Sequence, residues 1–382
     1  MNAHKDFGPF EGKIWLNVAS EGPLPHVAVE ALKDAVEWKL QPYQLTVPKF
    51  IGVPYQLKVA LGTFINVDPQ DIILGNSATY GLHILANGLP LKEGDEVLLM
   101  QNDFPANILP WLALSKKGIV VRQLKGQNHV LTVEEILQNI SPSTKVVCLS
   151  WVHTFSGHKI DAVKIGEICR ERKIVFILNC SQAIGAFQVD ISRLPVDAIT
   201  CAGYKWLCGP YGTGFCWIKP EVRETLNYNH AYWQSMLNES QLMSTDEIAL
   251  SDHKTARHYD IFATANFFNF MPWTASVGYL TKLGIDKIEQ YNLELIAQIV
   301  NGIDQQQFKL VSPMEPQARS NLVVFSHQNP EKNEAILNKL KEAGVFLALW
   351  KGNLRASPHI HNTRHDIERF VKTLNQCANT SR

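Results

Sequence analysis

The residues whose types and spacing suit chemistry lie between Cys201 and Phe215, in the segment C-A-G-Y-K-W-L-C-G-P-Y-G-T-G-F. Lys205 follows the apolar run 195–201, which is typical of a buried strand, and a glycine-rich loop comes after it. Strand ends in an open α/β sheet face the ligand crevice, and a lysine held there beside Trp206 is poorly solvated. Desolvation disfavours the ammonium form, so the amine can attack a carbonyl group. The alternative is a lysine whose ammonium stays in water at the surface.

A second apolar run, 174–178, precedes the polar residues Asn179 and Gln182. It is typical of a buried parallel strand whose carboxyl end carries polar side chains. A strand that ends in polar residues is thus followed by a strand that leads to a lysine and a glycine-rich loop. Both strand ends are expected to face the ligand crevice.

Strand and helix patterns alternate from about residue 70 to residue 220. We expect strands at 71–75, 96–100, 118–124, 145–150, 174–178 and 195–201, and helices at 79–89, 108–117, 133–140 and 162–172. This alternation is typical of a mostly parallel sheet covered by helices. Two further helices are expected before the sheet, at 25–40 and 55–66.

The pattern changes after about residue 270. Helices are expected at 285–305, 331–343 and 366–375, and strands at 321–326 and 345–348. This is typical of a smaller α+β domain. We therefore expect a large domain over 14–270 and a small C-terminal domain over 271–382, with residues 1–25 packed against the small domain. The polar stretch 228–253 is expected to be a surface excursion.

The block around Lys205 and the strand that ends at Asn179 resemble the class V aminotransferase family, whose enzymes depend on pyridoxal 5'-phosphate (PLP). That family includes cysteine desulfurases, cysteine C–S lyases, kynureninase and isopenicillin N epimerase. The resemblance extends over roughly residues 14–375. It implies an α/β protein of fold type I, the fold of many PLP-dependent transferases, in which Lys205 forms a Schiff base with the aldehyde of PLP.

A turn between an expected strand and an expected helix carries Ser77, Ala78 and Thr79. Amides at a helix N-terminus bind phosphate, and the resemblance implies that this turn binds the phosphate of PLP. The turn also fits a helix that is simply capped by Ser77 or Asn76, and the two interpretations can hold together. The resemblance further implies that Tyr204 contacts the phosphate. It also implies that Thr264 reaches the phosphate from the partner subunit of a homodimer.

The resemblance implies that Phe104 covers the pyridine ring of PLP, because it stands where desulfurases carry a stacking histidine. The neighbouring A-N-I-L-P-W is similar to the desulfurase segment A-N-I-V-P-W. An aromatic ring stacks on pyridine by dispersion, although Phe104 also fits an ordinary core position. Because phenylalanine transfers no proton, proton transfer then depends more heavily on Lys205. Gln182 and Thr154 are expected to hydrogen-bond the phenolic oxygen of PLP.

Asn179 departs from the family pattern, in which an aspartate pairs with the protonated pyridine nitrogen. Such a carboxylate keeps the ring cationic and makes it a strong electron sink. Asparagine is neutral and can instead donate an N–H to an unprotonated ring nitrogen. Because a neutral ring stabilises a carbanion less well, Asn179 favours β-elimination or epimerisation over transamination.

Arg355, in L-R-A-S-P-H-I-H-N-T, is expected to bind a substrate carboxylate, because family members place an arginine here and guanidinium binds carboxylate bidentately. A solvent-exposed arginine is the alternative. Ser20, in the N-terminal loop 17–25, is a second expected contact. The run 345–353 lacks the cysteine that desulfurases carry upstream of this arginine. A persulfide-forming desulfurase is therefore not expected.

The composition limits which binding partners and which cell compartment are expected. The 382 residues include 36 basic and 36 acidic side chains, so neither nucleic acid nor an anionic membrane surface is an expected partner. No apolar run reaches transmembrane length, and the first residues do not resemble a signal peptide. Seven cysteines without zinc-site spacing indicate buried free thiols in the cytoplasm and no metal.

The sequence therefore predicts a cytoplasmic, homodimeric PLP enzyme that acts on an amino acid or a small derivative. β-Elimination from a sulfur-bearing amino acid is the first expectation, epimerisation the second and class V transamination the third. A protein of another class, which binds cofactor or ligand without catalysis, is the alternative. Asn179 favours that alternative, whereas Lys205 and Arg355 oppose it.

Overall fold

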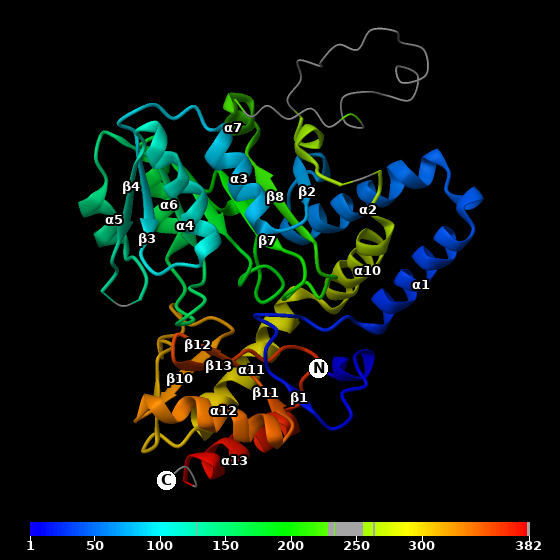
Figure 1. Cartoon of the computed structure of the whole chain (residues 1–382), viewed down its shortest axis with the longest axis vertical. Coiled ribbons are helices and arrows are strands. Elements are labelled where there is room, and N and C mark those ends of the chain that lie inside the picture. The colour runs from blue at the N-terminus through cyan, green and yellow to red at the C-terminus, as the bar shows by residue number, and fades with distance from the viewer. Residues whose placement is uncertain (128, 228–232, 234–254, 263, 380–382) are drawn as a thin grey trace.

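Figure 1 shows a computed structural model of the chain, which describes residues 1–127, 129–227, 233, 255–262 and 264–379. Helices pack around one large sheet in the upper part of the view. Smaller sheets and the C-terminal helices form the lower part, where the N-terminal segment also lies (Figure 1). Most of the expected surface excursion at 228–253 lies outside the described residues.

The large sheet has seven strands in the order β2-β8-β7-β6-β5-β3-β4. All neighbouring pairs are parallel except those made by β8, which runs antiparallel to β2 and to β7. The predicted mostly parallel sheet is therefore confirmed. The strand bounds are β2 Ile72–Gly75, β3 Glu96–Met100, β4 Val120–Leu124, β5 Thr144–Ser150, β6 Val175–Asn179, β7 Ala198–Ala202 and β8 Gly214–Ile218.

Helices connect the strands of this sheet in the predicted order. They are α3 Ala78–Gly88, α4 Pro105–Leu112, α5 Val133–Asn139 and α6 Ala162–Glu171. A further helix that was not predicted, α7 Pro220–Thr225, follows β8. Thr132 begins α5 with a capping box, because its hydroxyl accepts from Glu135 N and the Glu135 carboxylate accepts from Thr132 N. Local sequence signals of this kind fix where the helices begin, and the turns before α3 and α4 lie at the carboxyl edge of the sheet.

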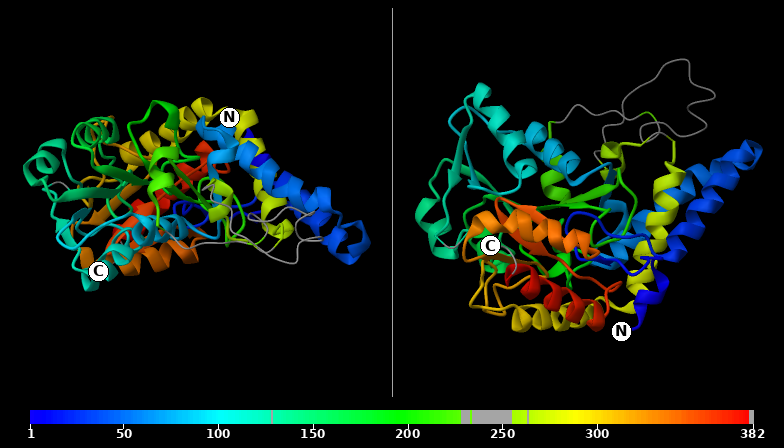
Figure 2. Two further views of the ribbon diagram at one scale, coloured as in Figure 1. Left: turned by 90° about the horizontal axis from the view of Figure 1, so that it is seen from above. Right: turned by 60° about the horizontal axis from the view of Figure 1, so that its bottom comes forward.

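Two helices before the sheet project from the body of the molecule, as both views of Figure 2 show. They are α1 His26–Leu40 and α2 Val47–Ile65, which pack against α10 Phe267–Leu283. Helix α2 begins eight residues before the predicted start at Tyr55. Pro48 lies in its first turn, where proline needs no N–H partner, but Pro54 lies inside the helix. These two prolines hid the first part of the helix from sequence analysis.

The C-terminal part of the chain contains α11 Ile285–Gly302, α12 Asn333–Glu342 and α13 Arg364–Asn379. Its antiparallel sheet has the order β12-β13-β10-β9, with bounds Ala348–Trp350, Asn353–Ala356, Val323–His327 and Phe308–Leu310. The predicted strand 345–348 is divided. Its first residues form β11 Val345–Phe346, which pairs in parallel with the N-terminal β1 Ile14–Trp15. The N-terminal segment therefore lies against the C-terminal part.

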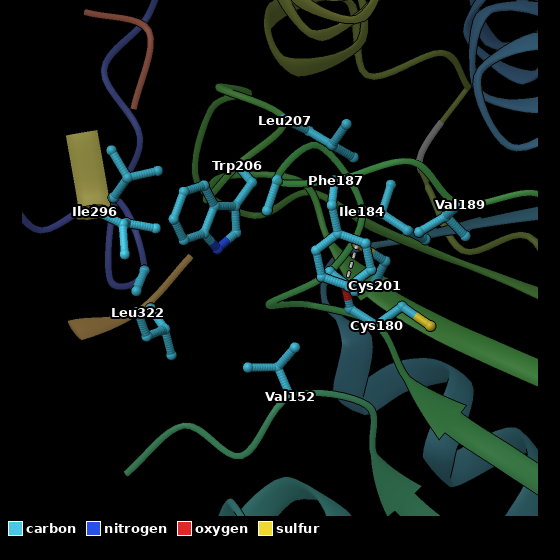
Figure 3. Packing of buried hydrophobic residues seen from close by; sticks show 14 of the residues in the cluster. Val152, Cys180, Ile184, Phe187, Val189, Cys201, Trp206, Leu207, Ile296 and Leu322 are labelled. Carbon is cyan, nitrogen blue, oxygen red and sulfur yellow. Dashed lines mark hydrogen bonds between the residues drawn. The ribbon is translucent and has the colours of Figure 1, made fainter. Parts of the chain in front are cut away.

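One apolar core extends from the large sheet to the C-terminal helices. Figure 3 shows the fully buried indole of Trp206 with Ile296 of α11 and Leu322 on one side and Phe187 on the other. The loop that carries Lys205 is thus anchored by packing from both parts of the chain. All seven cysteines are free and buried, as predicted. No helix in the described part of the chain is both long and apolar enough to cross a membrane.

A buried ion pair attaches α2 to the large sheet. Lys58 Nζ lies 2.7 Å from Asp260 Oδ2, and both side chains are almost fully buried. The other carboxylate oxygen of Asp260 accepts a hydrogen bond from Leu74 N in β2, at 2.8 Å. Because β2 leads directly into the turn at Ser77, this pair supports the edge of the sheet at which the predicted site lies.

Replacing Lys58 by methionine is expected to destabilise the protein by about 3–5 kcal/mol, because it leaves a buried carboxylate without its cation. The denaturation midpoint in guanidinium chloride measures the change. Lys33→Met is the matched control, since Lys33 pairs with Glu30 on the exposed surface of α1 and contributes less than about 1 kcal/mol. Equal shifts for the two variants would contradict the role given to the buried pair.

Candidate functional site

A cavity opens at the carboxyl edge of the large sheet, beside the ends of β5, β6 and β7. Its lining includes Lys205 and eight of the nine residues predicted to bind a cofactor: Ser77, Ala78, Thr79, Phe104, Thr154, Asn179, Gln182 and Tyr204. The ninth, Thr264, is described but does not line it. No acidic side chain is among the described residues that line the cavity.

Lys205 follows β7 and is only 9% exposed, which excludes the surface-lysine alternative. Burial, and secondarily the positive charge of Arg355, lowers the pKa of Lys205 to about 8. Gly22 of the N-terminal loop contacts this segment, and the Gly22 N–H donates to the Tyr204 carbonyl at 2.8 Å. A side-chain Cβ at Gly22 would lie 1.9 Å from the Lys205 carbonyl oxygen. Only glycine therefore lets this loop close over the lysine.

The turn at the start of α3 offers backbone donors. Ser77 occupies the N-cap position, but no side chain of the described chain caps the helix there. The Ser77 hydroxyl instead donates to Asn76 Oδ1 at 3.0 Å, so the simple capping interpretation does not hold. Helix N-terminal amides without a capping side chain are suited to bind a phosphate group. Tyr204, whose ring lies 4.9 Å from the ring of Tyr211, lines the same cavity.

Phe104 covers part of the cavity at the start of α4. Its ring is stacked on Phe155, with 6.5 Å between centroids, and lies 5.5 Å from Lys205 Nζ. It is only partly buried and faces the cavity, so it is not an ordinary core residue. A flat apolar side chain in this position suits an aromatic ligand ring.

The amides of Asn179 and Gln182 are held by protein partners. Asn179 Nδ2 donates to Asn107 Oδ1 at 2.8 Å, and Asn179 Oδ1 accepts from Ser181 N at 3.0 Å. Gln182 accepts from the indole N–H of Trp206 at 2.8 Å and donates to the Ala19 carbonyl at 2.9 Å. Each amide nitrogen has a second hydrogen, so each side chain keeps one donor for a ligand in the cavity.

Arg355 is 1% exposed, which excludes the solvent-exposed alternative. Its guanidinium donates to the Ser20 hydroxyl at 2.8 Å and to the Thr154 carbonyl at 3.2 Å. Burial lowers its pKa to about 10, and no ion pair among the described residues includes Arg355. A buried guanidinium without an acidic partner calls for an anionic ligand, and a carboxylate fits its geometry.

Sequence analysis missed three polar residues that support the site. The carboxylate of Asp103 contacts Asn107 and Ser150, and Asn107 contacts Asn179. Asp103 and Asn107 stand in the quoted segment D-F-P-A-N-I-L-P-W, where only Phe104 was given a role. Two short polar side chains at i and i+4 in an otherwise apolar turn and helix were the available signal.

Comparisons with known proteins agree with this geometry. The family model for aminotransferase class V matches residues 55–370. A probable cysteine desulfurase of Methanothermobacter thermautotrophicus is 23% identical, over 99% of this chain and 98% of the relative. Isopenicillin N epimerase of Streptomyces clavuligerus is 22% identical, over 94% of this chain and 93% of the relative.

Solved structures share the whole fold. The cystine C–S lyase C-DES, in complex with its reaction product cysteine persulfide, has a TM-score of 0.88 at 23% identity and covers 97% of this chain and 99% of its own. A mutant of C-DES with glycine covalently linked to the PLP cofactor has a TM-score of 0.89 at 22% identity, over 97% and 98%.

The chain belongs to the class V aminotransferase family. It is a PLP-dependent enzyme of fold type I, so the predicted family, fold, cofactor and enzymatic nature are confirmed. The cavity fits PLP on its own chemistry, because it joins uncapped helix amides, a buried lysine and a flat aromatic side chain in a space without acidic lining residues. Which reaction the enzyme catalyses is a separate question.

The pKa of Lys205 predicts the pH at which its amine becomes reactive. In cofactor-free protein, the rate of Lys205 acetylation by acetic anhydride is expected to rise with pH around a midpoint near 8 rather than 10.5, because only the unprotonated amine reacts. Peptide mass spectrometry measures the modified fraction. Arg355→Met is expected to raise the midpoint, because it removes a positive charge beside the lysine. A midpoint near 10.5 in the native chain would show that burial does not tune this amine.

Proposed function

We propose that the enzyme cleaves the C–S bond of a sulfur-bearing amino acid by β-elimination. The observation that carries this proposal is the neutral amide of Asn179 at the end of β6, where the family pattern has an aspartate. Bound PLP would supply an aldehyde and an electron-accepting ring. A ring without a paired carboxylate is a weaker electron sink, which disfavours reactions that need a long-lived carbanion. Elimination discharges that negative charge at once, onto sulfur.

The side chains in the cavity and beside it divide the proposed reaction between them. Arg355 and Ser20 hold the substrate carboxylate, as their mutual hydrogen bond prepares them to do. Lys205 holds the cofactor before the substrate enters and then takes the proton from Cα as general base. The Cβ–S bond breaks, and sulfur leaves with the bonding electrons. Hydrolysis of the remaining enamine gives a 2-keto acid and ammonia.

The hairpin beside Arg355 supports release of the sulfur rather than its transfer to the protein. Strands β12 and β13 are joined by Lys351 and Gly352, with φ of 48° and 78°, a tight left-handed turn. No cysteine lies between Val345 and Asn353 to accept sulfur. Trp350 stands there instead, with its ring 5.8 Å from the Arg355 guanidinium carbon. The similar C-DES is named a cystine C–S lyase, which favours the same reaction class.

Epimerisation is the second candidate, because one relative is an isopenicillin N epimerase. It needs only that a proton return to Cα from the opposite face, and it tolerates a weak electron sink for the same reason as elimination. Phe104 supplies no proton, so Lys205 and Tyr204 are the titratable lining residues that remain. Transamination is the third candidate.

We also propose that the enzyme works as a homodimer in the cytoplasm. Apolar side chains stand exposed on the projecting α1 and α2 and on the link between them: Val27, Val36, Leu40, Tyr43, Val47, Ile51, Tyr55 and Val59. A second copy of this chain would cover them. Thr264 does not line the cavity of its own chain, which supports its assignment to the phosphate site of the partner subunit. The seven free thiols fit a reducing compartment.

Proton NMR in heavy water, with holoenzyme and a panel that includes L-cysteine and L-cystine, distinguishes the three reactions. We expect pyruvate and ammonia. Deuterium at Cα with mixed chirality would favour epimerisation, and a keto acid formed only with a second amino acceptor would contradict the role of Asn179. Cysteamine is the matched control, because it lacks the carboxylate that Arg355 would bind and should not react. Asn179→Asp is expected to gain transaminase activity.

Thr264 can be assigned to the partner's site by complementation. Lys205→Ala and Thr264→Ala homodimers are expected to be inactive and weakly active, respectively. When they are mixed and allowed to exchange subunits, half of the dimers should be hybrids, each with one intact site, so activity should rise toward a quarter of the native value. No gain on mixing, with hybrids shown by native mass spectrometry, would place Thr264 at its own subunit's site or at none.

A further inference from the structure

Asp103 is a buried carboxylate that the proposed reaction does not use. It is 3% exposed and lies between β3 and α4. Four donors surround it: Ser150 N at 2.9 Å, the Ser150 hydroxyl at 2.6 Å, Phe104 N at 2.6 Å and Asn107 Nδ2 at 2.9 Å. A group that accepts four hydrogen bonds and donates none is an ionised carboxylate.

No ion pair of the described residues includes Asp103. The titratable groups that face it are His153 and Cys148. Burial lowers the pKa of His153 and raises that of Cys148, so both stay neutral near pH 7. The charge of Asp103 is therefore held by hydrogen bonds alone. Their direction is fixed, because a carboxylate accepts only from donors.

This charge sets the direction of two amides in succession. Asn107 Nδ2 gives its hydrogens to Asp103 at 2.9 Å and to the Ser150 hydroxyl at 2.8 Å, so Asn107 Oδ1 must face the other way. There it accepts from Asn179 Nδ2 at 2.8 Å. The reverse orientation of Asn107 would place its oxygen against the carboxylate. Asn179 is thus obliged to present nitrogen, not oxygen, to Asn107.

The opposite side of the Asn179 amide agrees with this orientation. Its Oδ1 accepts from Ser181 N at 3.0 Å, which leaves one N–H of Nδ2 as the only side-chain hydrogen without a described protein partner. Asn179 lines the cavity, so that N–H is the donor which it offers to a ligand. The buried guanidinium of Arg355, which donates to the carbonyl of the lining residue Thr154, adds a positive charge beside the cavity and also opposes a protonated ring.

We propose that Asp103, acting through Asn107, holds Asn179 as a hydrogen-bond donor to the pyridine nitrogen of PLP and so keeps that nitrogen unprotonated. Asp103 is a positioning residue, not a catalytic one. The proposal rests on the proposed use of this cavity for PLP and deepens it. The weak electron sink becomes a property that the protein enforces through the carboxylate of Asp103, which is linked to Asn179 by way of Asn107.

Nitrogen-15 NMR of holoenzyme loaded with ring-labelled PLP tests this directly. The ring nitrogen of the native enzyme is expected to show the shift of unprotonated pyridine from pH 6 to pH 9. Asn179→Asp supplies the protonated reference. A protonated ring in the native enzyme overturns the proposal, and this measurement needs no substitution. Failure of the chain to bind PLP at all would instead contradict the proposed function.

The variant Asp103→Asn tests the proposal by the direction in which the pKa of the ring nitrogen changes. Removing a nearby negative charge lowers the pKa of a ring nitrogen when only through-space electrostatics acts. If Asp103 acts by orienting Asn107 and through it Asn179, the same substitution removes that constraint and leaves the contact with Ser181 N to hold the amide of Asn179. The protonation constant of the ring nitrogen is then expected to increase at least tenfold. A fall, or no change, overturns the proposal.

Two further samples complete the experiment. Ser150→Ala removes a partner of Asp103 without breaking the chain of hydrogen bonds from Asp103 to Asn179, so the ring should stay unprotonated. Asp103→Asn combined with Asn179→Asp should give the ring nitrogen a higher pKa than Asn179→Asp alone, because Asn107 is then free to donate to the new carboxylate. An equal pKa in these two variants would show that Asp103 does not control Asn107. The label reports the ring nitrogen itself, so titration of Lys205 or Tyr204 is not mistaken for it.

Discussion

The site depends on two buried cations, Lys205 and Arg355, that have no acidic partner among the described residues. Lys205 lines the cavity and Arg355 lies beside it, hydrogen-bonded to the carbonyl of the lining residue Thr154, and the described residues that line the cavity include no carboxylate. An uncompensated buried charge is expensive, and it depresses the pKa of both groups. The same deficit makes the cavity suited to a doubly charged phosphate and to the carboxylate of an amino acid. What is unfavourable for the empty protein therefore favours the ligands. It also lowers the pKa of Lys205 to about 8, so that a fraction of its amine is in the reactive, unprotonated form near neutral pH.

The N-terminal segment completes this environment. Ala19 N donates to the Ser357 hydroxyl at 3.0 Å, and the Ala19 carbonyl accepts from Gln182 in the turn after β6. The neighbouring Ser20 holds Arg355, and Gly22 contacts the lysine loop. A few consecutive residues thus join the cofactor region to the C-terminal part of the chain. Their contribution is geometric, because they fix the distance between the guanidinium of Arg355 and the amine of Lys205.

Much of the fold and of the cavity could be predicted from sequence, because both follow from local rules. Polar residues at the ends of buried strands, such as Asn179 and Lys205, must meet at the carboxyl edge of a parallel sheet. The link from Asp103 to Asn179 could not be predicted, because it depends on which side chains from β3, α4 and β6 become neighbours. The first turns of α2 were hidden by prolines that only tertiary packing tolerates. The role of Thr264 concerns a second chain and remains a prediction.

The buried cysteines have a consequence for chemical durability. Burial raises the pKa of every one of the seven thiols, and thiolates are the form that attacks sulfur compounds. An enzyme that liberates thiols or persulfides at its own active site is surrounded by species that would modify exposed cysteines. By keeping all of its thiols protonated and inaccessible, this protein would remain inert toward such products. It could therefore turn over repeatedly without self-inactivation and without a separate reductant to restore it.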